Sequence, residues 1–489
     1  MAYLIRDLLA DESKLRKLEK LRKEGIDPYP YTYSRTHLAA EVVANFPALE
    51  GKKARVAGRI MVKRDMGKLS FLDLLDMSGR IQILVRADSL DKGSAVVLDN
   101  LDSGDTIGAG GMVTKSKRGE ISIDASEITM LSKSLATLPE KFHGLTDTEV
   151  RYRKRYLDLI MNPQIREIFK LRAEFISYIR SFLDGKGYLE VETPVLQPTY
   201  GGAEAKPFVT HHNALDADFY LRIATELYLK RLLVGGIEKV YEFGKDFRNE
   251  DIDSTHNPEF TMLEFYEAYG DYNTFAGYVE QMISGFAKKH FGKDTIEFDG
   301  RPLELAPPFK RVYFVEEIKK HSGIDVSTMT DSQATEIAKK EKLPIQVKNR
   351  YHVADALFDK YVKPSLFAPT FVMDFPAYMC PLVKDKRGDP KLSEKFDLYV
   401  GGMEVAPCYS ELTDPIEQRK KFEEQQEQRK KGDDEAPPMD NDFLEAMEYG
   451  MPPAAGIGLG IDRMIRIFTN NASIKEVVLF PSVRPEEGK

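Results

Sequence analysis

The chain has 489 residues, of which 42% are hydrophobic and 30% charged, so we expect more than one folded domain rather than a disordered protein. Its net charge of -8 at pH 7 excludes a wholly basic surface for coating nucleic acid, and no DNA partner is expected. The two cysteines, Cys380 and Cys408, cannot form a disulfide framework, and no signal peptide or membrane-spanning run is recognisable. A cytoplasmic protein without a membrane partner is therefore expected.

Residues 1–50 predict a helical extension at the N-terminus. Apolar and basic residues follow a helical period from about Leu8 to Glu24, and Gly25 ends it. The basic side chains either form a solvated helix face or contact phosphates, and the sequence leaves both interpretations open.

Residues 51–143 predict a small β-barrel. In "RIQILV" the apolar residues Ile81, Ile83 and Val85 alternate with other residues, which is typical of strands. Several such strands separated by turns favour a five-stranded oligonucleotide-binding (OB) barrel, although periodicity alone allows another small barrel.

Residues 144–162 predict a linker, and residues 163–489 a separate catalytic domain. The linker contains a basic cluster around "RYRKR". Beyond it, a helical stripe that includes Leu171, Phe175 and Ile179 precedes the extended segment "LEVETPVL". Strands and helices then alternate irregularly, which favours an α+β fold over a doubly wound sheet.

Three short segments are the strongest indication of function. "KGYLEVETPVL" contains Pro194, "FRNE" spans Phe247 to Glu250, and "GIGLGIDR" ends at Arg463. The last lacks the third glycine of a dinucleotide fingerprint, and the chain has no phosphate loop ending in Gly-Lys-Ser/Thr. In this order the segments resemble motifs 1, 2 and 3 of class II aminoacyl-tRNA synthetases. Longer stretches, such as "HNPEFTMLEFYEAYGDY", resemble the lysyl enzymes of the subclass shared with aspartyl and asparaginyl enzymes.

The resemblance implies an OB-fold anticodon-binding domain, followed by a class II catalytic domain built on an antiparallel sheet. It also implies a homodimer, and a reaction in which lysine and ATP give lysyl-adenylate and pyrophosphate. The lysyl group then passes to the 3′ end of tRNA(Lys) in protein synthesis. The implied partners are therefore tRNA(Lys), ATP and L-lysine, with Mg²⁺ as the cofactor.

Arginine and aromatic side chains of motifs 2 and 3 are the implied catalytic and ATP-binding groups. Activation needs positioning and charge neutralisation rather than a general base, because the attacking group is already a carboxylate. The resemblance assigns catalysis to Arg248, Glu250 and Arg463, which also bind ATP together with His256, Asn257 and Phe260. His256 and Asn257 could equally form a structural turn before Pro258.

Carboxylates are the implied substrate-selecting groups, since a pocket for an ammonium must offer negative charge. A glutamate inside the apolar run "FTMLEFY" is costly to bury, which favours a functional role. The chain departs from the lysyl pattern at Pro407, where asparagine is typical, and at Tyr409, where phenylalanine is typical. The implied lysine-binding residues are Gly202, Glu226, Arg248, Glu264, Tyr266, Tyr409 and Glu411.

Asp397 and Glu404 are the implied magnesium ligands, although they could also be ordinary surface acids. Asp397 is a departure, because the family usually has glutamate there.

In the barrel, Phe71, Gln82 and Glu120 match the positions that read the central uridine of the anticodon. Phe71 could instead be a core aromatic. Gln82 is expected on the face opposite Ile81 and Ile83, outside the core.

Other functions remain as alternatives. Ligation of aspartate or asparagine is disfavoured by Glu264 and Glu411, and lysylation of a protein is disfavoured by the N-terminal barrel. A non-catalytic tRNA-binding paralogue has no reason to keep Arg248, Glu404 and Arg463.

Overall fold

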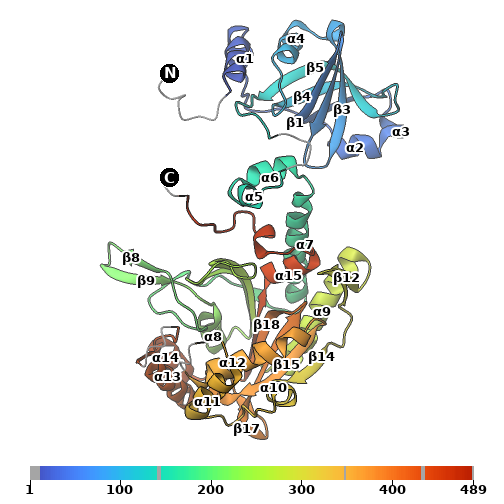
Figure 1. Ribbon diagram of the computed structural model, residues 1–489. Helices are drawn as coiled ribbons and strands as arrows, with labels where there is room; N and C mark the ends of the chain where they lie inside the picture. Colours follow the sequence, from blue (N-terminus) through green and yellow to red (C-terminus); the bar gives the residue numbers. More distant parts are fainter. Residues whose placement is uncertain (1–10, 140–144, 346–348, 431–434, 487–489) are drawn as a thin grey trace. The chain divides into compact units, whose positions relative to one another are not determined.

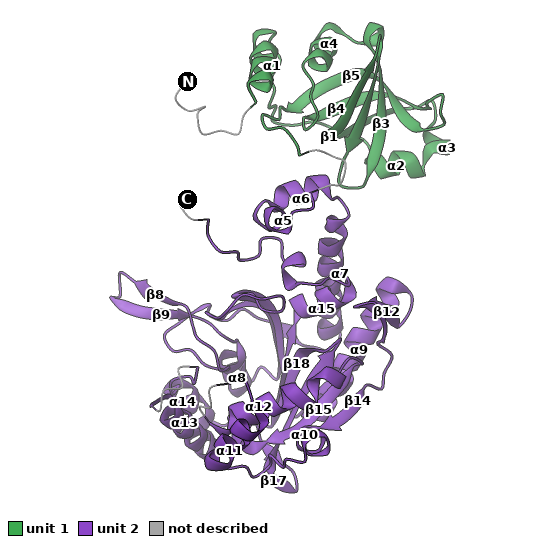
Figure 2. Cartoon of the chain, in the orientation of Figure 1, with its two compact units in different colours: residues 1–144 green, residues 145–489 purple. Residues whose placement is uncertain are grey.

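Figure 1 shows the computed structural model of the chain, which describes residues 11–139, 145–345, 349–430 and 435–486. The chain divides into two compact units, Met1–Gly144 and Leu145–Lys489, coloured separately in Figure 2. The expected boundary between residues 143 and 144 lies outside the described residues. No helix within the described ranges is both long enough and apolar enough to cross a bilayer.

Unit 1 is a closed five-stranded barrel with strand order β1-β2-β3-β5-β4, which confirms the OB-like architecture expected for residues 51–143. Side chains alternate between the two faces of each strand, and Ile81, Ile83 and Val85 of β3 lie in the barrel core. The N-terminal extension belongs to the same unit, because Leu21 and Val42 pack into that core. The elements are α1 (Glu12–Lys23), α2 (Ala39–Ala44), α3 (Phe46–Leu49), β1 (Lys53–Met66), β2 (Leu69–Leu75), β3 (Arg80–Arg86), α4 (Lys92–Asp99), β4 (Thr106–Lys115) and β5 (Ile121–Ser132).

Unit 2 is built on a large sheet with strand order β14-β15-β17-β18-β19-β11-β10-β6, with β16 paired to β17. The central pairs are antiparallel as expected, whereas the pairs β14–β15 and β10–β6 at the two ends are parallel. These strands are β6 (Leu189–Glu190), β10 (Lys239–Phe247), β11 (Glu259–Ala268), β14 (Lys310–Tyr313), β15 (Thr370–Pro376), β16 (Asp385–Lys386), β17 (Asp389–Val400), β18 (Met403–Ser410) and β19 (Ala454–Gly460).

Two smaller sheets accompany the large one. A hairpin of β12 (Thr295–Phe298) and β13 (Arg301–Glu304) forms one of them. The other has the order β7-β9-β8, from β7 (Leu196–Gln197), β8 (Val209–His212) and β9 (Ala217–Leu221). In Figure 1 the hairpin β8–β9 projects from the left side of unit 2.

Helices cover both faces of the large sheet. Apolar residues of α7, α9 and α15 pack with Phe396 and Leu398 of β17 in one core, whereas α10 and α12 pack with Tyr399 in another. Because side chains alternate along a strand, Lys395 and Asp397 lie on the same face as Tyr399, away from the larger core. The helices are α5 (Thr148–Arg153), α6 (Arg155–Met161), α7 (Ile165–Asp184), α8 (Glu226–Val234), α9 (Tyr272–Phe291), α10 (Phe314–Ser322), α11 (Asp331–Glu341), α12 (Arg350–Tyr361), α13 (Pro415–Lys430), α14 (Asn441–Glu448) and α15 (Ile461–Phe468).

Candidate active site

The central strand β11 places polar side chains on one face of the sheet and apolar ones on the other. Leu263 and Phe265 are fully buried in the larger core. Phe260, Glu264 and Tyr266 therefore point to the opposite face, where two cavities lie. The neighbouring strand β19 contributes glycines to this face, which leave room for those side chains.

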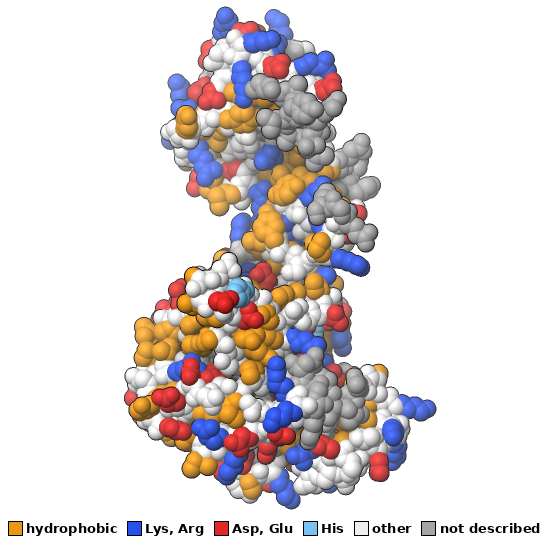
Figure 3. All heavy atoms as spheres, turned by 90° about the vertical axis from the view of Figure 1, so that its left-hand side faces the viewer, with side chains coloured by type: hydrophobic (Ala, Val, Ile, Leu, Met, Phe, Trp, Pro, Cys, Tyr) orange, Lys and Arg blue, Asp and Glu red, His pale blue; other side chains and the backbone are white. Residues whose placement is uncertain are grey.

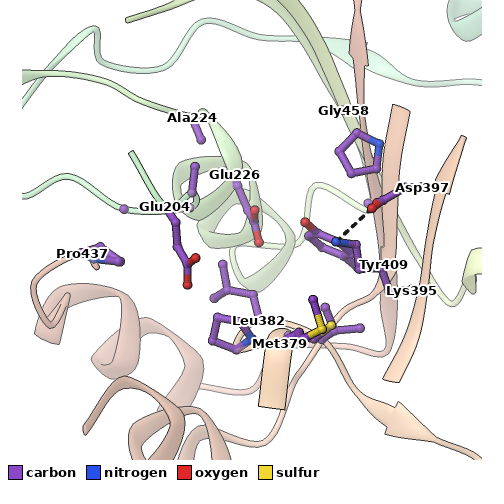
Figure 4. Close-up of a pocket in the computed structure, with 18 of the residues that line it drawn as sticks. Glu204, Ala224, Glu226, Met379, Leu382, Lys395, Asp397, Tyr409, Pro437 and Gly458 are labelled. Atoms are coloured by element: carbon purple, nitrogen blue, oxygen red, sulfur yellow. Dashed lines mark ion pairs between the residues drawn. The ribbon is translucent and has the colours of Figure 1, made fainter. Parts of the chain in front are cut away.

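The first cavity has a volume of about 290 Å³ and is lined by acidic side chains. Glu226 from α8 and Glu264 from β11 are both buried and line it together with Tyr266 and Tyr409. Gly202 has φ +86°, and its backbone lies close to Glu226. A Cβ at this position would be 3.1 Å from Cβ of Glu226. Figure 4 shows Glu226 and Tyr409 beside this cavity.

Glu226, which lines the cavity, belongs to a buried ion cluster whose other members lie behind the lining. Lys230, one turn after Glu226 on α8, lies 2.5 Å from the carboxylate of Glu226 and also pairs with Glu411. Burial alone would lower the pKa of Lys230, but the two carboxylates outweigh it and raise the pKa above its usual value. The ammonium therefore stays charged, and it holds Glu226 and Glu411 in place.

Among the described residues, no cation forms an ion pair with Glu264. Its carboxyl accepts hydrogen bonds from the hydroxyl of Tyr266 at 2.9 Å and from the backbone N–H of Thr225 at 3.3 Å. Burial, followed by the charges of Asp246 and Glu226, raises the pKa of Glu264 to about 8. Glu226 and Glu264 therefore both present carboxyl groups to the cavity, and Glu411 is paired with Lys230 behind it, so the cavity favours a cationic guest.

Asp397 and Glu404 lie at the same end of the sheet, on the neighbouring strands β17 and β18. Nζ of Lys395 lies 3.2 Å from Oδ2 of Asp397, the contact drawn as a dashed line in Figure 4. The other oxygen of Asp397, Oδ1, is buried and has no hydrogen-bond partner among the described residues. Burial raises the pKa of Asp397 to about 7 even though Lys395 opposes the shift. Pro407 is the cross-strand neighbour of Asp397, so two of the three departures from the lysyl pattern are paired across β17 and β18.

The second cavity also has a volume of about 290 Å³, and its lining includes every residue expected to bind ATP. Nη1 of Arg463 donates to the backbone oxygen of Glu404 at 2.6 Å, and Nη2 lies 3.4 Å from Nε2 of His256. The guanidinium of Arg248 lies 5.1 Å from the centre of the Phe260 ring.

The turn that precedes Pro258 is held by its own hydrogen bonds. Nδ1 of His256 lies 2.8 Å from Oδ2 of Asp253. Nδ2 of Asn257 donates to the backbone oxygen of Glu259 at 2.5 Å, and its Oδ1 accepts from the N–H of Ser482 at 3.2 Å. His256 and Asn257 therefore stabilise the turn, and they also line the cavity.

Arg248 stands where the two cavities meet. It lines both of them, as do Met262, Glu404 and Pro407. Its Nε is buried and has no hydrogen-bond partner in the described part of the chain. A buried donor without a partner is costly, so this position suits a ligand that supplies an acceptor.

Sequence reasoning missed three charged residues that shape the site. Lys230 was not singled out, although its spacing of four from Glu226 could have indicated a pair. Lys395 shares a strand face with Asp397, which the alternation could have shown. Asp246 is 1% exposed, and its Oδ1 lies 3.4 Å from Nε of Arg222. No pattern in the sequence indicated that burial.

In unit 1, the three expected base-reading residues lie outside the barrel core, where Phe71 is partly exposed, Glu120 is exposed and Gln82 is buried. Gln82 and Asp73 are directly opposite each other on β3 and β2, and Phe71 is two residues from Asp73. Phe71 is partly exposed and is not part of the barrel core, which disfavours its interpretation as a core aromatic. Nε2 of Gln82 donates to Oε2 of Glu120 at 2.6 Å.

Comparison with known proteins agrees with this geometry. A family described as tRNA synthetases class II (D, K and N) matches residues 147–484, and one described as an OB-fold nucleic acid binding domain matches residues 54–131. Similar proteins include a lysine–tRNA ligase of Carboxydothermus hydrogenoformans, 49% identical across 97% of this chain and 98% of that protein. Another, from Moorella thermoacetica, is 47% identical across 98% of both chains. A third, from Pelotomaculum thermopropionicum, is 48% identical across 96% of this chain and 94% of that protein.

Proposed function

The chain belongs to the class II tRNA synthetases for aspartate, lysine and asparagine, and within that family we propose that it is a lysine–tRNA ligase. It is an ATP-dependent aminoacyl-tRNA ligase, and the observation that selects lysine is the charge of the first cavity. Glu226 and Glu264 line this cavity, whereas the ammonium of Lys230 lies behind it, where it pairs with Glu226 and Glu411. An aspartate pocket needs the opposite charge, and asparagine has none to match.

The amino acid lies in the first cavity with its ammonium side chain toward Glu264, Tyr266 and Glu411. Its α-amino group lies near Glu226 and Gly202, and its carboxylate reaches Arg248. Tyr409 lines the same space. Pro407 has no side-chain donor, so the carboxylate depends on Arg248 more strongly than it would beside an asparagine.

ATP lies in the second cavity. Glu250 accepts from the amino group of adenine, and the ring of Phe260 and the guanidinium of Arg463 take the two faces of the base. His256 and Asn257 lie along the nucleotide on the turn described above.

Adenylate formation takes place at Arg248. A carboxylate oxygen of lysine bonds to the α-phosphorus of ATP while the bond from that phosphorus to the bridging oxygen breaks, and pyrophosphate leaves with the electron pair. Charge grows on the oxygens of the α-phosphate, where a planar guanidinium can bind both the carboxylate and the phosphate. The unpaired Nε of Arg248 at the junction supports this role.

Magnesium is the proposed cofactor, and Asp397 and Glu404 fit it. The buried, unpartnered Oδ1 of Asp397 is the kind of hard oxygen that this ion prefers, and Glu404 lines both cavities. When bound, the ion neutralises phosphate charge. Lys395 holds the shortened Asp397 side chain through Oδ2, which leaves Oδ1 for the ion.

In the second step, a ribose hydroxyl at the 3′ end of tRNA(Lys) attacks the lysyl carbonyl and AMP leaves. The barrel binds the anticodon, with Phe71 stacking on the central uridine while Gln82 and Glu120 contact its edge. The proposed location is the cytoplasm, which the two free, buried cysteines support.

A homodimer is the proposed assembly. The edge strand β6 and the segment that follows it expose apolar side chains, with Leu189 52% and Leu196 48% exposed. The hairpin β8–β9 exposes Val209 and Leu215. Figure 3 shows hydrophobic side chains gathered on this side of unit 2. A second copy that covers such surface would remove it from water.

The test is aminoacylation of unfractionated tRNA with each labelled amino acid in turn. The proposal predicts acid-precipitable label with lysine alone, and only with ATP and magnesium present. Charging with aspartate or asparagine would contradict the substrate assignment, and absence of charging with every amino acid would favour a non-catalytic tRNA-binding protein.

A further inference from the structure

Arg172 of helix α7 joins the two segments that carry the residues proposed to hold adenine. Its Nη1 donates to Oδ1 of Asp462 at 2.5 Å, and its Nη2 donates to Oγ1 of Thr261 at 2.8 Å. Thr261 directly follows Phe260 in β11. Asp462 directly precedes Arg463 in α15. One guanidinium therefore binds the neighbours of both adenine-binding residues.

The carboxylate of Asp462 also continues the sheet where β19 ends. The pair β11–β19 stops at Met262 and Gly460, and the chain then begins α15 at Ile461. The backbone N–H of Thr261 lies one residue beyond this last pair, and it donates to Oδ2 of Asp462 at 2.9 Å. Each oxygen of the carboxylate therefore binds a different element, Oδ1 to α7 and Oδ2 to β11.

The groups themselves define the direction of each hydrogen bond. A guanidinium and a backbone N–H only donate, and a carboxylate only accepts. The hydroxyl of Thr261 is therefore the acceptor in its bond with Arg172. A further contact, from Nη1 of Arg172 to the backbone oxygen of Val477, is longer at 3.5 Å. Asp462 is 2% exposed, so it depends on Arg172 for compensation of its buried charge.

Arg172 reaches these partners from the face of the sheet opposite to the cavities. The side chain of Thr261 points to the same face as Leu263 of the larger core, because side chains alternate along β11. Helix α7 packs on that face, and Figure 1 shows it beside α15. Phe260 points to the other face, and Arg172 lines neither cavity. Arg172 therefore acts on a bound nucleotide through its partners.

The separation of Phe260 and Arg463 determines how well a base fits between them. Stacking on a ring and contact with a guanidinium both need close approach of the two surfaces. A gap of about 0.5–1 Å loses roughly a quarter to a half of the dispersion energy of a contact. A shift of β11 relative to α15 on this scale would weaken adenine binding, although every residue that touches the base would still be present.

We propose that Arg172 is a positioning residue for ATP, which fixes the separation of Phe260 and Arg463 through its bonds to Thr261 and Asp462. The inference rests on the proposed function, because it presupposes that adenine lies between the Phe260 ring and the Arg463 guanidinium. Lysine uses the first cavity, so its binding should not depend on Arg172.

The experiment measures pyrophosphate exchange without tRNA, with adenosine as a competitor of ATP. Adenosine tests the base site without the phosphates, and neither Ki nor KM depends on how much of a preparation is folded. Arg172→Met should raise the Ki of adenosine and the KM for ATP roughly three- to thirtyfold, as expected when contacts with both faces of a base weaken. The KM for lysine at saturating ATP should stay near the wild-type value.

Thr261→Val tests the same set of bonds without removing a charge. It deletes the hydroxyl that accepts from Arg172 and leaves the backbone N–H bonded to Asp462, so it should raise the Ki of adenosine less than Arg172→Met does. Combined with Arg172→Met it should cause no further change, because the bond between the two side chains is already lost. Thr261→Ser keeps the hydroxyl and should behave as the wild type.

Arg151→Met is the matched control for the loss of a partly buried ion pair. The side chain of Arg151 is 16% exposed and that of Arg172 is 17% exposed. Arg151 pairs with the buried Asp158 and with Glu476, and none of these three residues lines either cavity. This variant should keep the wild-type Ki of adenosine.

A wild-type Ki of adenosine in Arg172→Met or in Thr261→Val would overturn the inference. Equal increases in the KM for ATP and for lysine, or an equal rise of the Ki in Arg151→Met, would do so too. If the wild type exchanges pyrophosphate with lysine, these results leave the proposed function intact. Adenosine that does not compete with ATP in the wild type would remove the inference alone. A wild type that exchanges with no amino acid would contradict the proposed function as well.

Discussion

Arg248 is placed to bind both substrates, because its guanidinium lines both cavities beside the expected positions of the carboxylate and the α-phosphate. Arg248→Lys keeps a positive charge but loses the planar fork that can bind both groups at once. We expect adenylate formation to fall roughly 10²- to 10³-fold, as for other losses of preorganised charge stabilisation. Single-turnover formation of lysyl-adenylate measures this directly, and a rate near that of the wild type would contradict the role.

Glu264 links lysine binding to pH. Its pKa is raised to about 8 in the empty cavity, and an incoming ammonium favours the ionised carboxylate. Binding therefore releases a proton below that pH, and the affinity for lysine should rise as the pH increases from 6 to 8 and then level off. Burial also raises the pKa of Glu411, but its ion pair with Lys230 opposes that shift, so the pH dependence is assigned to Glu264.

Replacement of Glu264 tests this linkage. Glu264→Gln should weaken lysine binding roughly 10- to 100-fold, the effect of losing a charged hydrogen bond, and should flatten the pH dependence. Calorimetry in buffers of different ionisation enthalpy measures the released proton. Glu267→Gln is the matched control on the same strand, since Glu267 pairs with Lys239. Equal losses of lysine and ATP binding in Glu264→Gln would be evidence against the assignment.

At the scale of the element, the glycines of β19 decide whether the substrate pocket can form. A Cβ at Gly456 would lie 2.0 Å from the ring of Tyr266 and 2.5 Å from Oε1 of Glu411. At Gly458 the nearest atom would be Sδ of Met262 at 3.5 Å, an ordinary contact. The motif therefore carries a packing requirement in addition to its role in ATP binding.

Gly456→Ala should displace Tyr266 and Glu411 and raise the KM for lysine at least tenfold, with a smaller change in the KM for ATP. Gly458→Ala should raise the KM for lysine less. Steady-state adenylation kinetics of the two variants provide the comparison. A larger effect at Gly458 than at Gly456 would show that the steric argument is wrong.

The elements differ in how far the sequence could predict them. Alternation predicted the strands of the barrel and placed Gln82 outside the barrel core, although Gln82 is itself buried on the other face of β3. The motifs indicated most of the residues that line the two cavities, but Glu411 lies behind the first one. The ion pair of Lys230 and Glu411 joins residues 181 positions apart. The parallel pairs at the two ends of the sheet form between strands that are distant in the sequence. Neither leaves a local pattern, so neither was predicted.

At the scale of the whole molecule, recognition and chemistry belong to two units with separate cores. A change confined to the outside of the barrel should therefore affect tRNA use and spare amino acid activation. Phe71→Ala removes the proposed stacking platform and should raise the KM for tRNA roughly tenfold or more. Pyrophosphate exchange without tRNA should stay at the wild-type rate, and a parallel loss of exchange would argue against this separation.

The central claim is that the acidic cavity beside Arg248 activates lysine. Its most direct test is exchange of labelled pyrophosphate into ATP, with magnesium and without tRNA, in the presence of each of the twenty amino acids separately. The structure predicts exchange with lysine alone, because the buried Glu226 and Glu264 that line the cavity favour a cationic guest. Exchange with aspartate or asparagine instead, or with none of the twenty, would contradict it.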